Sequence, residues 1–297
     1  MSTYNGEKYL NQQIESILNQ KDVDLTLYVR DDGSTDNTVS IIDEFCSKSS
    51  NIVFIKGSNI GYAMSFMWLV YYCTSNESNY YAFSDQDDIW EETKLISAIN
   101  LLNEKSDLSK PALYYSDLKV VDKNEEFIRM ANDWEGKIDK FMILTFIGIR
   151  GCTMVYNQSL QNILTSYKVS KIPGHDTFVA LVAFWTGCVV YDHKAYILYR
   201  QTGQNVSITG TSKLDKFKKN LRYVYKRITV KSNERQIMAN ELLNYAAYID
   251  NIEDVKKVAV YKNSFQSTLK LLVDKKYFKH TLSINFTNRI LMLLQKF

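Results

Sequence analysis

The chain has 297 residues, of which 45% are hydrophobic and 23% charged, a composition typical of a globular protein with a sizeable core. Its 2 prolines and 11 glycines exclude long disordered linkers, and the longest apolar stretches, such as Phe141–Ile149, are too short to cross a bilayer. The net charge of +3 conceals an asymmetry, because residues 211–297 contain 18 Lys and Arg against 7 Asp and Glu, which predicts an acidic region able to hold cations and a basic region facing an anionic partner.

Over the first 210 residues, short β-rich runs alternate with helical patterns. The predicted strands are Leu25–Arg30, Ile52–Lys56, Tyr80–Ser84 and Ala112–Ser116, and the predicted helices are Leu10–Leu18, Asp36–Cys46, Gly61–Cys73 and Glu91–Leu102. Strands separated by single helices predict an α/β fold with βαβ units and a mostly parallel sheet. Met1–Gly6 reads as the end of a first strand that is truncated. After residue 210 the pattern becomes helical.

Polar residues follow three of the predicted strands, where parallel α/β sheets bind their ligands. One group is Asp31-Asp32-Gly33-Ser34, the next includes Asn59 and Gly61, and the third is Asp85-Gln86-Asp87-Asp88. Clustered carboxylates repel one another unless a cation is present, and Mg²⁺ and Mn²⁺ take oxygen ligands. A solvated acidic turn, or a cap for the helix at Glu91, explains Asp85–Asp88 equally well. Capping does not require both Asp31 and Asp32, whose oxygens suit a base N–H and ribose hydroxyls.

Four segments in this order resemble family-2 glycosyltransferases of the GT-A fold. They are Ser2–Leu10, Asp31–Asp36, Asn59–Gly61 and Phe83–Trp90. The last is similar to the rhamnosyltransferase-type branch found in capsule and O-antigen loci. The resemblance covers residues 1–210 and implies a Rossmann-like GT-A catalytic domain there, with a mostly parallel central sheet flanked by helices, followed by a basic helical region at residues 211–297.

The resemblance also implies roles for individual residues. Donor binding is expected from Thr3, Tyr4 (which would stack on the base), Asp31, Asp32, Asn59, Gly61, Asp85 and Arg200. Asp85 and Asp87 match the DxD-type motif, which holds a divalent cation, Mg²⁺ or Mn²⁺, against the donor diphosphate. The acceptor side is expected to include Asp88, Trp90, Gly151, Cys152 and His175.

The catalytic base is expected at Asp176, in a segment that resembles the family's loop-to-helix motif. An inverting transfer needs a carboxylate to remove the proton of the acceptor hydroxyl. The alternative for Asp176 is a plain N-cap of a helix over Thr177–Trp185. Arg200 belongs to a motif, Tyr199–Asn205, that resembles the one closing over the donor phosphates, but Thr202 stands where this branch is expected to have His.

The implied function is inverting transfer of a sugar, with dTDP-rhamnose or a UDP-hexose as donor, to a lipid-linked oligosaccharide in bacterial surface polysaccharide synthesis. A nucleotidyltransferase is disfavoured because residues 1–20 contain only Gly6, too few glycines for a phosphate loop. A non-catalytic sugar-nucleotide-binding partner of a polysaccharide assembly complex stays an alternative, because of the short first strand and Thr202.

The basic region and the cysteines indicate where in the cell the protein is expected to act. The segment 211–231 combines an apolar stripe with lysines and arginines, so it either lies on an anionic membrane or packs its stripe on the catalytic domain. The four cysteines have no CxxC spacing, which predicts buried thiols in a reducing compartment. With no signal peptide at the start, we expect a cytoplasmic protein, peripheral to the inner face of the plasma membrane, and no nucleic-acid partner.

Overall fold

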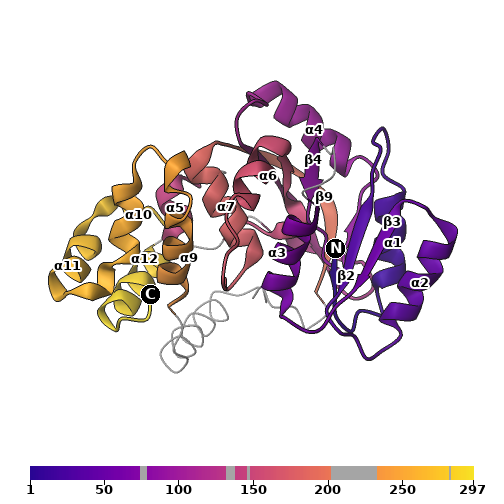
Figure 1. Cartoon of the computed structure of the whole chain (residues 1–297), viewed down its shortest axis with the longest axis horizontal. Helices are drawn as coiled ribbons and strands as arrows, with labels where there is room; N and C mark the ends of the chain where they lie inside the picture. Colours follow the sequence, from indigo (N-terminus) through magenta and orange to yellow (C-terminus); the bar gives the residue numbers. More distant parts are fainter. Residues whose placement is uncertain (74–78, 132–137, 146–147, 202–232, 281) are drawn as a thin grey trace. The chain divides into compact units, whose positions relative to one another are not determined.

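A computed structural model describes residues 1–73, 79–131, 138–145, 148–201, 233–280 and 282–297 (Figure 1). The chain forms two compact units. The first comprises Met1–Lys137, Ile149–Lys168 and Gly174–Thr202, and the second comprises Ile138–Gly148, Val169–Pro173 and Gly203–Phe297. The predicted domain boundary between residues 210 and 211, the basic segment 211–231 and Thr202 all lie outside the described residues.

The first unit begins with a parallel sheet of three strands in the order β1-β2-β3. These strands are β1 (Ser2–Thr3), β2 (Leu27–Asp31) and β3 (Ile52–Lys56). The helices that connect and follow them are α1 (Leu10–Leu18), α2 (Thr38–Lys48) and α3 (Tyr62–Tyr72). The expected short first strand is therefore present, and it pairs in parallel with β2.

A second sheet in the same unit has the order β4-β8-β6-β9-β5, with β7 paired to β6. Its strands are β4 (Tyr80–Ala82), β5 (Ile89–Trp90), β6 (Ala112–Val121), β7 (Phe127–Met130), β8 (Val155–Asn157) and β9 (Cys188–Arg200). Only β6 and β9 pair in parallel, and the other pairs are antiparallel. The α/β class is confirmed. The sheet predicted to be mostly parallel is mixed, because β1–β2–β3 and β6–β9 pair in parallel while the other pairs are antiparallel.

The helices of the first unit bury apolar faces against these strands. Leu10, Ile14 and Ile17 of α1 lie in one cluster with Val29 of β2 and Ile197 of β9, so the cluster spans both sheets. The remaining helices are α4 (Lys94–Lys105), α6 (Gln158–Thr165), α7 (His175–Thr186) and the short 3₁₀ helix η2 (Gly151–Thr153). The polar groups considered below lie at the ends of β2 and β9 and in the loop that follows β4.

The second unit is helical in its described residues. Its helices are α5 (Lys140–Thr145), α9 (Glu234–Leu243), α10 (Ile252–Ala259), α11 (Phe265–Val273) and α12 (Leu282–Leu293), with 3₁₀ turns at Ala246–Tyr248, Tyr261–Asn263 and Lys275–Tyr277. Figure 1 shows α5, which is distant in sequence, beside α9, and the two helices are in contact. The Thr145 hydroxyl donates to the carbonyl of Tyr277, and Asn288 donates to the carbonyl of Thr145, so polar contacts fasten α5 to this unit.

Two further sequence expectations can be compared with the fold. None of the described helices is both long enough and apolar enough to span a membrane. All four cysteines are free thiols, but only Cys152 is buried, whereas Cys46 and Cys73 are half-buried and Cys188 is exposed. The prediction of buried thiols is therefore wrong for Cys188, which is the first residue of β9 and is exposed where that strand begins.

Candidate active site

The loop after β2 is organised around the carboxylate of Asp31. One oxygen, Oδ1, accepts from the Thr3 hydroxyl at 3.0 Å and from the Ser34 hydroxyl at 2.5 Å. The other, Oδ2, accepts from the backbone N–H groups of Gly33 and Ser34. Gly33 adopts a φ of +87°, which favours glycine, and the turn brings both N–H groups back to the carboxylate. Thr3 is fully buried beneath Asp31, so it supports this loop.

The neighbouring Asp32 links the loop to the segment before α3. Its Oδ1 pairs with the Arg30 guanidinium at 2.5 Å and accepts from the Ile60 N–H at 2.9 Å. Its Oδ2 accepts from the Gly61 N–H at 2.9 Å, and the same N–H donates to the side chain of Asn59. The structure thus brings together Asp31, Asp32, Asn59 and Gly61, as the sequence analysis requires. The oxygens of both carboxylates therefore already accept hydrogen bonds from other groups of the protein.

Tyr4 is exposed, as are Asn59 and Gly61, and Gln86 holds the backbone of Tyr4. The Tyr4 N–H donates to Gln86 Oε1 at 2.8 Å, while Gln86 Nε2 donates to the Tyr4 carbonyl at 3.1 Å. This pair of hydrogen bonds ties the loop after β1 to the loop between β4 and β5. Sequence reasoning missed Gln86, since only its place between two aspartates marks it. The ring of Tyr4 is 48% exposed, which leaves it available for stacking.

Replacing Gln86 with leucine removes both hydrogen bonds at similar side-chain volume. For the nucleotide-sugar donor that the family resemblance implies, we expect the KM to rise about tenfold with a smaller change in kcat, because one or two hydrogen bonds that position Tyr4 contribute about 1 kcal/mol each. Steady-state kinetics with the donor varied will measure this. Gln158→Leu, which removes a contact to Tyr81 in β4, is the control and should leave the KM unchanged. An unchanged KM in Gln86→Leu would contradict the idea that Gln86 positions Tyr4 for donor binding.

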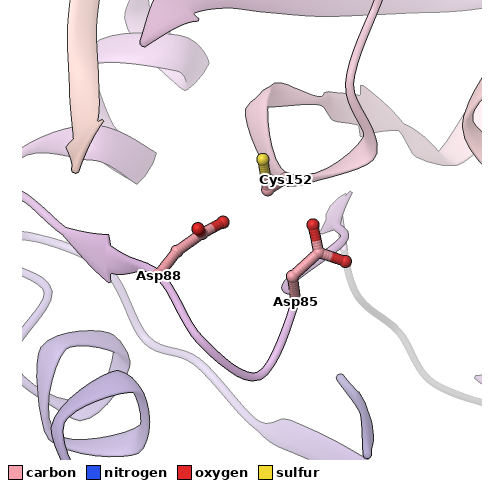
Figure 2. A group of neighbouring side chains, drawn as sticks. All are labelled: Asp85, Asp88 and Cys152. Atoms are coloured by element: carbon pink, nitrogen blue, oxygen red, sulfur yellow. The ribbon is translucent and has the colours of Figure 1, made fainter. Parts of the chain in front are cut away.

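The loop between β4 and β5 brings Asp85 and Asp88 together with Cys152 of η2. Figure 2 shows the two carboxylates on the side of the loop that faces Cys152. One ligand atom from each of these residues lies within 4.8 Å of those of the other two. Asp87, predicted as the second metal ligand, is not in this group. Asp88, which was expected on the acceptor side, stands in this group where Asp87 was predicted.

The electrostatics of this group favour a bound cation. Burial, followed by the charges of Asp87 and Asp176, raises the pKa of Asp85 to about 7. Burial and the charges of Asp85 and Asp87 also raise the pKa of Asp88 well above its ordinary value. Among the described residues, neither oxygen of Asp88 has a well-formed hydrogen bond. Burial raises the pKa of the Cys152 thiol as well, so the thiol stays protonated. The two carboxylates thus fit a hard divalent cation, which would neutralise their repulsion.

Asp176 stands in the first turn of α7, close enough to Asp85 for its charge to raise the pKa of that carboxyl. The residue at the N-cap of α7 is Gly174, so the helix begins two residues earlier than predicted and Asp176 is not its cap. Asp176 Oδ1 accepts from the Thr177 N–H at 2.6 Å. Burial raises the pKa of Asp176, and the nearby charge of Arg150 opposes that rise. A carboxylate of raised pKa is a stronger base.

His175 packs among aromatic rings instead of contacting Asp176. Its ring stacks on Phe66 with centroids 3.9 Å apart and meets Phe83 edge-on at 5.0 Å. Burial lowers the pKa of His175 to about 3, so the imidazole is neutral, and neither ring nitrogen has a hydrogen bond within the described part of the chain. A Cβ on Gly151 would lie 2.6 Å from His175 Nε2. Gly151 is therefore required by this close approach, which holds η2 against the start of α7.

Arg200, at the end of β9, contacts the backbone of the loop between β4 and β5. Its guanidinium pairs with Glu125 at 3.0 Å, donates to the side chain of Gln12, and donates to the Asp87 carbonyl at 3.3 Å. The positive charge of Arg200 lowers the pKa of Asp87, although burial raises it overall. Arg200 is almost fully buried, so in this arrangement it holds the loop carrying Asp87.

Trp90, expected beside the sugar, is 5% exposed and belongs to the core cluster that spans both sheets. The ammonium of Lys94 lies 3.6 Å from the centre of its ring. Lys94 is fully buried, and no described residue accepts a hydrogen bond from its nitrogen. Burial lowers the pKa of Lys94 to about 7, while Cys152 and Asp88 act against that shift. Sequence reasoning missed Lys94, because a lysine in the first turn of a helix reads as exposed.

Comparisons with known proteins identify the family and the fold. The model of the family described as "Glycosyl transferase family 2" matches residues 1–164. A dTDP-rhamnosyl transferase, RfbG, of Shigella flexneri is 41% identical over 105 residues, which cover 34% of this chain and 36% of that protein. The matched region is thus little more than a third of that relative.

Two solved structures share the fold. A TarS fragment from S. aureus in complex with UDP-GlcNAc has a TM-score of 0.54 at 18% identity, over 98% of this chain and 88% of that one. The mannosyltransferase PcManGT from Pyrobaculum calidifontis, in complex with GDP-Man and Mn²⁺, has a TM-score of 0.53 at 13% identity, over 100% of this chain and 86% of that one. These likenesses confirm the GT-A fold. With more than half of its residues matched by the family model, the chain belongs to glycosyl transferase family 2.

Proposed function

We propose that this chain is a metal-dependent, inverting glycosyltransferase in which Asp176 is the catalytic base and Asp85 is a ligand of Mg²⁺ or Mn²⁺. The observation that carries the proposal is the gathering of carboxylates from separate segments. Asp85 and Asp88 lie with Cys152, and Asp176 is near enough to raise the pKa of Asp85. A fold gains no stability from such repulsion, which points to a positively charged ligand and a function.

The proposed chemistry follows from these positions. Asp176 accepts the proton of the acceptor hydroxyl as the hydroxyl oxygen forms a bond to the anomeric carbon of the donor. The bond from that carbon to the nucleotide diphosphate breaks on the opposite face of the sugar, which inverts the configuration. A bound divalent cation supplies positive charge that stabilises the leaving diphosphate. Asp85 would hold that cation, with Asp88 and the predicted ligand Asp87 on the same loop.

The substrates are proposed from the relatives. RfbG is named a dTDP-rhamnosyl transferase, which supports dTDP-rhamnose as donor, with UDP-hexoses as the alternative. TarS is bound to UDP-GlcNAc and PcManGT to GDP-Man, so the fold accommodates several nucleotides. We propose a lipid-linked oligosaccharide of a bacterial surface polysaccharide as acceptor. The chain would act in the cytoplasm with residues 1–210 as the catalytic domain, and residues 211–231 would approach an anionic membrane.

A screen of nucleotide sugars tests this function. In the presence of Mn²⁺, we expect dTDP-rhamnose to raise the melting temperature more than UDP-glucose, UDP-GlcNAc or GDP-mannose, and to be hydrolysed slowly without acceptor. The stabilisation arises because a ligand that binds only the folded state shifts the unfolding equilibrium, by about 2.7 kcal/mol at a hundredfold excess over its Kd. Thermal shift and release of dTDP measure the two effects. A larger response to a UDP-sugar would assign that sugar as the donor in place of dTDP-rhamnose. No response to any donor would contradict the proposed function.

A further inference from the structure

The last two helices of the chain each expose a row of large apolar side chains. The row on α11 and the row on α12 have spacings of four, seven or eight residues, which place each row on one face of its helix. The six residues are Phe265, Leu269 and Val273 on α11, and Leu282, Phe286 and Leu293 on α12. Their exposed fractions lie between 42% and 89%. We name these six residues the α11–α12 apolar rows.

These rows are not the faces with which the two helices pack in the second unit. Thr268 and Leu271 of α11 are buried, as are Leu291 and Met292 of α12. The two helices contact each other. Both helices are thus apolar on the packed side and again on the side that faces water. Rows of exposed apolar side chains favour binding to another surface, because their exposure to water is unfavourable.

The charge around the rows identifies the partner. Residues 261–297 contain seven lysines and arginines against one acidic residue, Asp274, and two of the seven, Lys276 and Lys279, pair with Asp254 and Asp139. The Asp274 carboxylate is already paired with Lys257 at 2.9 Å. Lys270, Lys275 and Arg289 are exposed on or next to the two helices. A second copy of this chain would bring an equally basic surface against this one, and the two would repel each other.

An anionic bilayer offers both features that the rows require. Its acyl region accepts apolar side chains of a helix lying in the interface, and its phosphate headgroups attract the surrounding lysines and arginines. We propose that the α11–α12 apolar rows dock the protein on the surface of an anionic phospholipid bilayer. This inference goes beyond the proposed function, because it needs neither donor nor transfer. It adds α11 and α12 to the membrane contact proposed above for residues 211–231.

Vesicle flotation tests the docking with the full chain and no nucleotide sugar. We expect the chain to float with vesicles containing phosphatidylglycerol and phosphatidylcholine at low salt, and to float less at high salt or with phosphatidylcholine alone. In Leu282→Gln/Phe286→Gln, the partition coefficient should fall at least about tenfold, since two large apolar side chains no longer leave water on docking. Both positions are exposed and glutamine favours helices, so folding should be retained.

Controls separate this docking from other effects. Phe127→Gln changes an exposed phenylalanine of β7, in the other unit, and should float like the wild type. Lys270→Gln/Lys275→Gln should weaken flotation at low salt only. Asp176→Asn should also float like the wild type, so loss of transfer and loss of docking are distinguishable. Equal flotation of wild type and Leu282→Gln/Phe286→Gln would overturn the proposal. So would an absence of flotation, or a wild-type dimer in sedimentation that the double variant dissociates.

Discussion

Asp176→Asn is expected to lower the rate of sugar transfer by about 10²- to 10⁴-fold, the range that general base catalysis contributes. The amide of asparagine cannot take up the proton of the acceptor hydroxyl. Its oxygen can still accept from the Thr177 N–H, so the first turn of α7 should stay intact. Donor affinity should not fall, because the change removes one negative charge near the proposed diphosphate site. Single-turnover transfer and calorimetric donor binding measure the two quantities separately.

The matched control for this experiment is Asp43→Asn, which alters an exposed aspartate of α2 that pairs with Lys56. It should transfer at the wild-type rate. The pH profile adds a second readout. Because burial raises the pKa of Asp176, the rate should fall with decreasing pH above the usual carboxylate range, as the base becomes protonated. Wild-type transfer by Asp176→Asn would assign the base to another residue.

Asp85→Asn is expected to abolish the metal response and to lower transfer by about 10²-fold or more, since electrostatic stabilisation of a leaving group is a large catalytic contribution. Mn²⁺ should stabilise the wild type against thermal unfolding and should stabilise the variant much less. This measurement does not depend on the identity of the donor or acceptor. An unchanged Mn²⁺ response in Asp85→Asn would exclude Asp85 as a ligand, and would point to Asp88 or Asp87 instead.

When metal is removed by chelation, Asp85→Asn should increase the stability of the folded chain. The pKa of Asp85 is raised from 3.8 to about 7 in the folded chain, so the folded state binds the proton more tightly. Its contribution to stability is therefore full below about pH 4 and is lost as the pH rises through 7. At pH 8, Asp85→Asn should be more stable than the wild type by on the order of 2 kcal/mol, allowing for partial screening. At pH 4 the two should be alike.

Asp107→Asn is the control for the stability experiment, because Asp107 is exposed and lies outside the site. It should not become more stable than the wild type at pH 8. Urea unfolding at several pH values, with and without Mn²⁺, measures all three proteins. A wild type that gains stability between pH 5 and pH 8 relative to Asp85→Asn would contradict the assigned electrostatics.

The strands that follow local patterns could be predicted from the sequence, and those that depend on distant contacts could not. The run Ile52–Lys56 forms β3 at its predicted bounds, since a short apolar run between polar segments suffices to define a strand. The strand predicted at Ala112–Ser116 continues to Val121, because β9 supplies partners such as Tyr199 for Val120. The predicted helix at Glu91 begins only at Lys94, because β9 pairs with Ile89 and Trp90.

The candidate site also combines residues that the sequence predicts with residues that only distant contacts bring together. Asp85 is predicted from its place after a strand that the pattern defines, whereas Asp176 is predicted only from the resemblance of its segment to a family motif. The closeness of Cys152 to Asp85 and Asp88 depends on where η2 packs, which no local spacing contains. Gln86 was missed for a similar reason, since its partner, Tyr4, is 82 residues away. The burial of Lys94 follows from the packing of α4 and runs against the ordinary preference of lysine for the surface.

The hydrogen bonds of Asp31 and Asp32 would affect how fast the proposed nucleotide donor binds. Their oxygens already hold the N–H groups of Gly33, Ile60 and Gly61. Loops fixed in this way lose little conformational entropy when a ligand arrives, and they need no rearrangement to receive it. Encounter by diffusion then limits association, so donors with different bases should associate at similar rates. Discrimination between them should reside in how quickly each one leaves.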